Sequence, residues 1–164
     1  MKTFRQIACV FFFVSLLLAG GCEQGTIVNK IVSASVYSGF TPAKVEIMPL
    51  SELIRPTEDQ EESKISMYVR LIDSFGCQSR APGVFRFELY QRILRAAEPK
   101  GRRVMLWPDI DLTNASKNYS FWQDFLRAYE FKLDFGSANS EGYILQVTFL
   151  CPTGRRLCSE YVLK

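Results

Sequence analysis

Histidine is absent from the 164 residues of the chain. Its absence removes the most common general base near neutral pH and the most common nitrogen ligand for metal ions. Ser-His and Cys-His catalysis are therefore excluded, whereas carboxylate or Ser-Lys chemistry is not. A zinc site is not expected either, because four convergent His or Cys ligands at motif spacing are missing. We expect no catalytic constellation and no cofactor.

Long apolar runs are also scarce, and the one exception lies at the start of the chain. Ile7–Ala19 is a stretch of thirteen uncharged residues, whereas a membrane-spanning helix needs about 20. Lys2 and Arg5 precede the run, and two glycines and Cys22 follow it. A basic start, an apolar run and small residues, in this order, are typical of a secretory signal peptide. We expect residues 1–21 to be cleaved off.

The junction Leu18-Ala19-Gly20-Gly21-Cys22 resembles the lipobox of bacterial lipoproteins. In that family the Cys thiol receives a diacylglyceryl group, the peptide is cut before the Cys, and the new amine is acylated, often with palmitate. The resemblance implies a lipid attachment at Cys22. Ala19 stands where the family more often has Leu, Val or Ile, and small residues at 19 and 21 also suit ordinary signal cleavage. A soluble secreted protein that begins at Cys22 is the alternative.

A lipid on Cys22 would hold the chain at a membrane without a spanning helix. Each buried methylene contributes roughly 0.8 kcal/mol, so one acyl chain holds marginally and two or three hold durably. Residue 23 is Glu rather than Asp, which resembles the signal for outer-membrane delivery in some Gram-negative bacteria. We therefore expect a cell-envelope protein, anchored at the periplasmic face of the outer membrane, with an envelope protein or a polysaccharide as its partner.

The chain after the signal peptide has the size of one domain and almost no net charge. Its 143 residues carry 18 basic and 17 acidic side chains, a net charge of +1. A nucleic-acid partner is not expected, because such binding requires a strongly basic face. We expect a lipidated Cys and short tether at 22–28 and one folded domain at 29–164.

Period-two alternation of apolar and polar residues dominates this domain and predicts half-buried strands. It is clearest in Lys64–Asp73, Phe85–Tyr90, Tyr129–Phe135 and Tyr143–Phe149, and weaker candidates lie near 27–37, 44–48, 103–107 and 157–163. About eight short strands separated by Gly and Pro turns predict an all-β antiparallel sandwich. Tyr68–Gly76 and Gly83–Tyr90 also resemble the strand–turn–strand units of immunoglobulin-like and prealbumin-like modules. The whole mature chain is similar to an uncharacterised family of bacterial lipoproteins, which implies a fold but no activity.

One segment departs from the strand pattern. Ser120 and Gln123 are spaced as in a helix capping box, and aromatic residues recur after them at spacings of three and four. We predict one short helix near 121–127, covering one end of the sandwich. Its aromatic neighbours could form a platform for sugar rings, but at helical spacing such residues more often belong to the core: Tyr119, Phe121, Trp122, Phe125 and Tyr129.

Three cysteines besides Cys22 follow the signal peptide, at 77, 151 and 158. A disulfide is permitted outside the cytoplasm, and Cys151 and Cys158 flank a turn. Residues directly opposed across an antiparallel hairpin share a face, so their numbers have an even sum when core-facing positions are odd in both strands. The sum of 151 and 158 is odd, although a bulge at Gly154 could restore the pairing. The bridge is thus left open.

The segment Trp107–Asn114 is the most polar loop after a strand. Asp109, Asp111 and Asn114 are oxygen donors of the kind that calcium loops use, but Gly and Glu are missing at the positions that an EF-hand requires. The alternative is that these side chains stabilise a turn. A second cluster, of basic residues, surrounds another turn and could meet lipid phosphates or simply be solvated: Arg92, Arg95, Lys100, Arg102 and Arg103.

Two functions are consistent with these patterns. The first is a non-catalytic envelope protein that presents a binding or structural module near the membrane. The alternative is a lipid-anchored carbohydrate-binding protein or a carboxylate-based hydrolase. An exposed cleft that holds both Asp109 and Trp122 would favour the alternative, whereas buried aromatic residues would favour the first.

Overall fold

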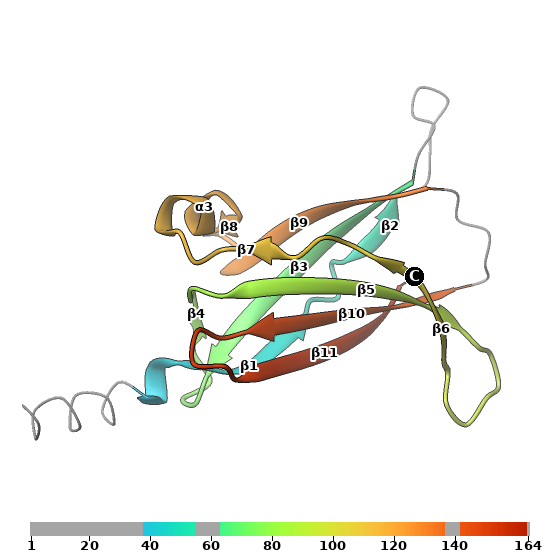
Figure 1. Cartoon of the computed structure of the whole chain (residues 1–164), viewed down its shortest axis with the longest axis horizontal. Coiled ribbons are helices and arrows are strands. Elements are labelled where there is room, and N and C mark those ends of the chain that lie inside the picture. The colour runs from blue at the N-terminus through green and yellow to red at the C-terminus, as the bar shows by residue number, and fades with distance from the viewer. Residues whose placement is uncertain (1–37, 55–62, 137–141, 164) are drawn as a thin grey trace, which may run out of the picture. The chain divides into compact units, whose positions relative to one another are not determined.

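The computed structural model describes residues 38–54, 63–136 and 142–163 (Figure 1). The predicted signal peptide, the lipobox with Cys22, the tether at 22–28 and the strand expected near 27–37 lie outside these ranges. Contacts divide the chain between Ser38 and Gly39, and the second unit, Gly39–Lys164, contains nearly all of the described residues. Among the described residues, no helix is long and apolar enough to cross a membrane.

The second unit is an antiparallel β-sandwich, as its alternation predicts. In the six-stranded sheet, the order is β1–β3–β9–β8, and β2 and β4 also pair with β3. In the five-stranded sheet, the order is β11–β10–β5–β6, and β7 also pairs with β5. The strands are β1 (Pro42–Ile47), β2 (Glu52–Ile54), β3 (Ser63–Asp73), β4 (Gln78–Ser79), β5 (Val84–Arg92), β6 (Lys100–Leu106), β7 (Ile110–Asp111), β8 (Trp122–Gln123), β9 (Ala128–Phe135), β10 (Tyr143–Leu150) and β11 (Arg156–Leu163).

Seven of the eight predicted strands correspond to β1, β3, β5, β6, β9, β10 and β11, and the eighth, near 27–37, lies outside the described residues. Three others, β4, β7 and β8, have two residues each, too few for a visible alternation. Strand β2 was not predicted, because three residues with only Leu53 partly buried carry no clear period. The finer resemblance to immunoglobulin-like or prealbumin-like modules stays a prediction.

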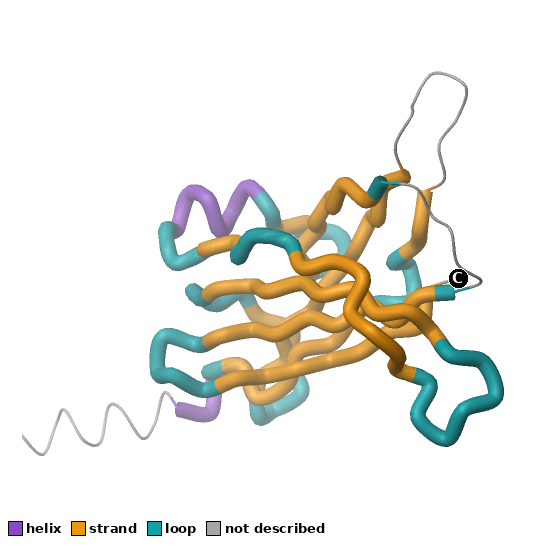
Figure 2. The backbone as a smooth tube through the Cα atoms, turned by 45° about the vertical axis from the view of Figure 1, so that its right-hand side comes forward, coloured by secondary structure: helices purple, strands orange, loops and turns teal. Residues whose placement is uncertain are grey.

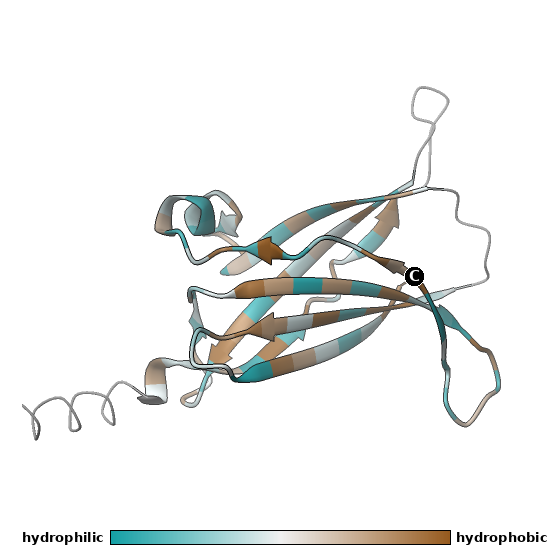
Figure 3. Ribbon diagram, in the orientation of Figure 1, coloured by the Kyte–Doolittle hydropathy of each residue, from teal (hydrophilic) through white to brown (hydrophobic). Residues whose placement is uncertain are grey.

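The core lies between the two sheets and is rich in aromatic rings. Alternate residues of β3, β5, β9 and β10 point inward, which appears as alternating bands along the strands in Figure 3. The Phe85 ring lies 4.7 Å from Phe149, 5.0 Å from Phe131 and 5.2 Å from Tyr129, measured between centroids. Because β5 and β10 belong to one sheet and β9 to the other, these rings join the two layers.

The short helix lies earlier in the chain than predicted. It is α3 (Ala115–Ser120), and Asn114 rather than Ser120 is its N-cap, accepting a hydrogen bond from Lys117 N at 3.0 Å. The segment predicted to be helical instead holds β8 and a tight turn, in which Arg127 has a φ of 49°. The aromatic spacing was misleading, because Trp122 and Tyr129 are partners across the β8–β9 pair.

The sandwich has two ends, which Figures 1 and 2 both show. One end, here called the α3 end, gathers the 3₁₀ turn η1 (Ser38–Phe40), the β3–β4 turn, α3, the β8–β9 turn and the β10–β11 turn. Ser74 N donates to Gly39 O at 3.2 Å, and Arg155 donates to Ala43 O at 3.3 Å, so the start of the unit is held at this end. The β5–β6 hairpin projects from the opposite end.

Candidate functional site

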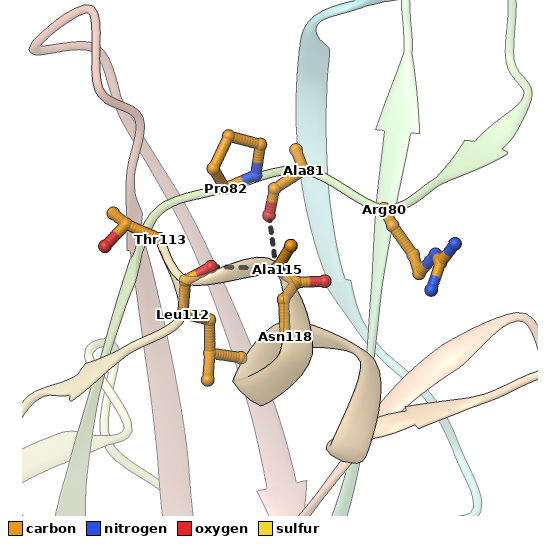
Figure 4. A pocket seen from close by; sticks show the side chains of 7 residues that line it. All are labelled: Arg80, Ala81, Pro82, Leu112, Thr113, Ala115 and Asn118. Atoms are coloured by element: carbon orange, nitrogen blue, oxygen red, sulfur yellow. Dashed lines mark hydrogen bonds between the residues drawn. The ribbon is translucent and has the colours of Figure 1, made fainter.

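A cavity of about 310 Å³ opens at the α3 end, between the β4–β5 linker and the segment that leads into α3. Its walls come from residues 80–82, 112–113, 115 and 118, as Figure 4 shows. Most of this lining is small or apolar, with Ala81, Pro82, Leu112 and Ala115 on the walls and Arg80 pointing away from them at the rim. A ligand in this cavity would therefore contact mainly apolar walls and few charged groups.

Asn118 fixes this cavity by joining three segments. Its Nδ2 donates to Ala81 O and to Leu112 O, each at 2.9 Å, and both bonds are drawn in Figure 4. Its Oδ1 accepts a hydrogen bond from the Tyr129 hydroxyl at 3.1 Å. The same hydroxyl accepts a hydrogen bond from Ala81 N at 3.0 Å. Burial raises the pKa of Tyr129 above its ordinary value. Because the polar atoms of the Asn118 and Tyr129 side chains are hydrogen-bonded to protein groups, these residues stabilise the cavity wall and are not free to bind a ligand.

The predicted aromatic group divides between core and surface. Tyr129 is fully buried, and Phe121 and Trp122 are partly buried against the core. Tyr119 and Phe125 are exposed, at 56% and 96%. The Arg80 guanidinium lies 5.1 Å from the Tyr119 ring centroid and 5.8 Å from that of Trp122. Asp124 accepts from Trp122 Nε1 at 2.9 Å, so this part of the rim is a connected polar and aromatic cluster.

A second hollow, here called the edge groove, has a volume of about 350 Å³ and lies where β9 faces the linker between β6 and β7. Trp107 Nε1 donates to Asp134 O at 2.8 Å and so bridges the two sheets. The lining is mixed, with rings, carboxylates and amines: Trp107, Pro108, Asp109, Ile110, Lys117, Phe121, Lys132, Leu133 and Asp134. Asp109 lines this groove and Trp122 belongs to the cluster around Arg80, so one hollow does not bring the two together.

The three oxygen donors proposed for calcium each have a partner of their own. Asp109 accepts from both Arg86 Nε at 2.9 Å and Arg86 Nη2 at 2.8 Å, Asp111 accepts from Thr113 N and Oγ1, and Asn114 caps α3. Hydrogen bonds from Arg86 lower the pKa of Asp109, and those from Thr113 lower the pKa of Asp111. The contacts of Asp111 and Asn114 are local, of the kind that stabilises turns and helix starts, whereas Asp109 is held by Arg86, 23 residues away. Across 38–54, 63–136 and 142–163, no three His, Cys, Asp or Glu side chains are grouped to hold a metal.

The cysteines of the described residues, Cys77, Cys151 and Cys158, are free thiols. Cys158 faces Thr148 in the β10–β11 ladder, with Sγ 3.5 Å from Thr148 Oγ1, and the pairing runs without a bulge. Cys151 lies in the turn instead, where its N–H donates to Arg155 O. The register thus places Cys158 opposite Thr148 and leaves Cys151 outside the ladder, which agrees with the odd sum of the two cysteine numbers.

The basic cluster lies on the β5–β6 hairpin and is partly neutralised. Arg103 pairs with Glu88 at 2.7 Å and Lys100 with Glu160 at 2.5 Å, whereas Arg92, Arg95 and Arg102 are exposed and form no ion pair with a described residue.

Two features of the site were not predicted from the sequence, the Asn118 junction and the Arg86–Asp109 pair. A single Asn, or a contact between residues 23 positions apart, produces no recognisable sequence pattern.

Comparison of the chain with protein-family models, with curated proteins and with solved structures gives no match, so its function is argued from its own residues.

Proposed function

We propose that this chain is a cell-envelope lipoprotein, held by acyl chains on Cys22, whose β-sandwich serves as a non-catalytic binding or structural module. The observation that carries the proposal is the order of the first 22 residues: a basic start, thirteen uncharged residues, and Leu18-Ala19-Gly20-Gly21-Cys22. This order suits export followed by lipid attachment. Glu23 supports delivery to the periplasmic face of the outer membrane.

The state of the carboxylates supports a non-catalytic role. A glycosidase-type hydrolase needs one carboxyl group that stays protonated near neutral pH as a general acid. Asp109 and Asp111 have lowered pKa values instead, so both are ionised and already hydrogen-bonded. Each contributes to local structure, and neither is prepared to donate a proton.

The lipid attachment is tested by metabolic labelling with radioactive palmitate. The wild-type chain is expected to carry the label, and Cys22→Ser to lose it. Cys77→Ser is the matched control, because Cys77 is an exposed thiol of the folded domain and its removal leaves the lipobox intact. Label that persists in Cys22→Ser, or that disappears in Cys77→Ser, would contradict the proposal.

A second candidate function is sugar binding in the edge groove, and its mixed lining favours it. Ligand sites commonly have volumes of about 300–1,000 Å³ with apolar walls and a few polar groups, and this groove combines the Trp107 and Phe121 rings with Asp134 and Lys132. Binding of envelope polysaccharide fragments, measured by calorimetry, tests it. Trp107→Ala is expected to abolish binding, whereas Phe125→Ala, outside the groove, is expected to preserve it.

A further inference from the structure

Exposed aromatic rings are confined to the α3 end of the sandwich. Among the described residues, the exposed aromatic side chains are Phe40 at 61%, Phe75 at 66%, Tyr119 at 56% and Phe125 at 96%. They lie in two pairs of segments at one end of the sandwich, η1 with the β3–β4 turn and α3 with the β8–β9 turn (Figures 1 and 2). The large exposed hydrophobic side chains elsewhere in the described ranges are aliphatic.

These four rings lie outside the hydrophobic core between the sheets. Phe125 is almost fully in solvent, the Phe40 and Phe75 rings lie with centroids 5.3 Å apart, and the Tyr119 ring packs against the Arg80 guanidinium. Single exposed apolar residues are ordinary, whereas a collection of them on one face marks an interaction surface. The loops of this end therefore present to solvent aromatic rings that are not part of the core.

Basic side chains surround the rings. Lys117 and Arg127 are exposed on the segments that carry the rings, and the β4–β5 linker, the β10–β11 turn and the start of β11 at the same end add three exposed arginines, Arg80, Arg155 and Arg156. None of these five forms an ion pair within the described part of the chain. Exposed carboxylates near the rings are fewer: Asp124 on the β8–β9 turn and Asp111 on β7. Separate apolar tips amid unpaired cations complement a planar anionic surface, with rings at the level of the lipid headgroups and arginines at the phosphates.

We infer that the α3 end docks onto an anionic phospholipid bilayer, with Phe40, Phe75, Tyr119 and Phe125 at the headgroup level. The inference uses the proposed lipid anchor for the nearness of a bilayer, but the docking surface belongs to the domain itself. The folded unit begins at this end, where Ser74 N donates to Gly39 O at 3.2 Å. Docking would fix the orientation of the domain, with the β5–β6 hairpin facing away from the membrane.

Amide hydrogen exchange of the full-length protein in vesicles tests the docking. Vesicles of phosphatidylcholine alone are compared with vesicles that also contain phosphatidylglycerol. In the anionic vesicles, we expect exchange in 73–80 and 119–127 to slow about tenfold, which corresponds to a docked state about 1.4 kcal/mol below the free state. Exchange in the hairpin, 92–103, is expected to stay unchanged. Unchanged exchange at the α3 end, or slowing at the hairpin instead, would overturn the inference.

Two double variants of the full chain test whether the rings themselves, rather than exposed hydrophobic side chains in general, cause the slowing of exchange. Phe75→Ser with Phe125→Ser is expected to abolish the slowing, whereas Leu50→Ser with Leu94→Ser, exposed at other places, is expected to preserve it. A third double variant, Arg127→Gln with Arg156→Gln, tests the role of charge and is expected to remove the preference for anionic lipid, at about fivefold for each arginine. Protection that survives loss of both Phe rings would overturn the inference, and so would equal protection by a soluble polyanion such as heparin.

Flotation of the same samples keeps the two proposals apart. A lipidated protein floats with both kinds of vesicle whatever its domain does. Flotation without slowed exchange at the α3 end would overturn the docking and leave the anchor intact. Failure to float with neutral vesicles would contradict the anchor, and the exchange pattern in anionic vesicles would still decide the docking.

Discussion

At the scale of single residues, Asn118 holds the α3 end together. It is 8% exposed and bonds to two backbone carbonyls and one buried hydroxyl. Asn118→Ala removes the side-chain donor to the Leu112 carbonyl, one of two donors to the Ala81 carbonyl, and an acceptor of the Tyr129 hydroxyl. The free energy of unfolding is expected to fall by about 2–4 kcal/mol, because each unsatisfied buried group costs about 1–3 kcal/mol. Urea denaturation measures the change.

Asn114→Ala is the matched control for that variant. It removes one exposed hydrogen bond at the start of α3, and loss of such a cap costs about 1 kcal/mol. Equal losses of stability in the two variants would show that Asn118 acts only within its own helix, contrary to the three-segment junction.

Tyr129 gives the folded state a pH dependence on the alkaline side. Its pKa is raised by burial, so the folded protein keeps a proton that the unfolded chain releases near pH 10. This contribution to stability is complete below about pH 10 and is lost as the pH rises through the folded pKa. Urea unfolding between pH 8 and 11 is expected to show declining stability.

Tyr129→Phe is expected to flatten that decline only in part, since the pKa values of Tyr90 and Cys151 are raised as well. A slope identical to that of the wild type would contradict the assignment to Tyr129.

At the scale of elements, the β10–β11 hairpin has a register that can be tested with sulfur chemistry. Thr148 and Cys158 are directly paired, with side chains in contact. Thr148→Cys is therefore expected to form a disulfide with Cys158 under oxidising conditions and to raise the free energy of unfolding by about 2–3 kcal/mol. Thiol counting by mass spectrometry and urea denaturation report the two effects.

Leu150→Cys is the control for the register, because residue 150 is paired with Arg156 rather than Cys158. A bridge in this variant, or its absence in Thr148→Cys, would contradict the pairing. In the wild-type protein, the three thiols of the domain are expected to be free.

The elements also show what the sequence could predict. The alternation in β3, β5, β9 and β10 identified these strands because one face of each is buried. Burial of one face of a strand requires an apolar residue at every second position. The helix was misplaced because Trp122 and Tyr129 pack across a strand pair at a spacing that also suits a helix. The contacts of Asp109 and Asn118 join distant segments, and such contacts follow from the assembled fold rather than from local pattern.

At the scale of the whole domain, an aromatic core joins the two sheets. Phe131 is fully buried and lies against Phe85 and Phe87 of the facing sheet, with centroids 5.0 Å and 4.7 Å away. Phe131→Ala is expected to reduce the free energy of unfolding by about 3–5 kcal/mol. Phe125→Ala removes a ring that is 96% exposed and is expected to change stability by less than about 0.5 kcal/mol. Comparable losses in urea denaturation would contradict the division between core rings and docking rings.

The whole molecule is proposed to combine two membrane contacts with different chemistry. The acyl chains on Cys22 supply attachment, and the rings and arginines of the α3 end supply orientation. Only the first is needed for membrane localisation, so a variant that lacks Phe75 and Phe125 is expected to stay in the membrane fraction while Cys22→Ser leaves it.

The central claim, lipid attachment at Cys22, is tested most directly by mass spectrometry of the N-terminal peptide of the protein purified from membranes. The account predicts a peptide that begins at Cys22 and carries the added mass of a diacylglyceryl group and an acyl chain. A peptide that begins at Met1, or one that begins at Cys22 with an unmodified thiol and amine, would contradict it.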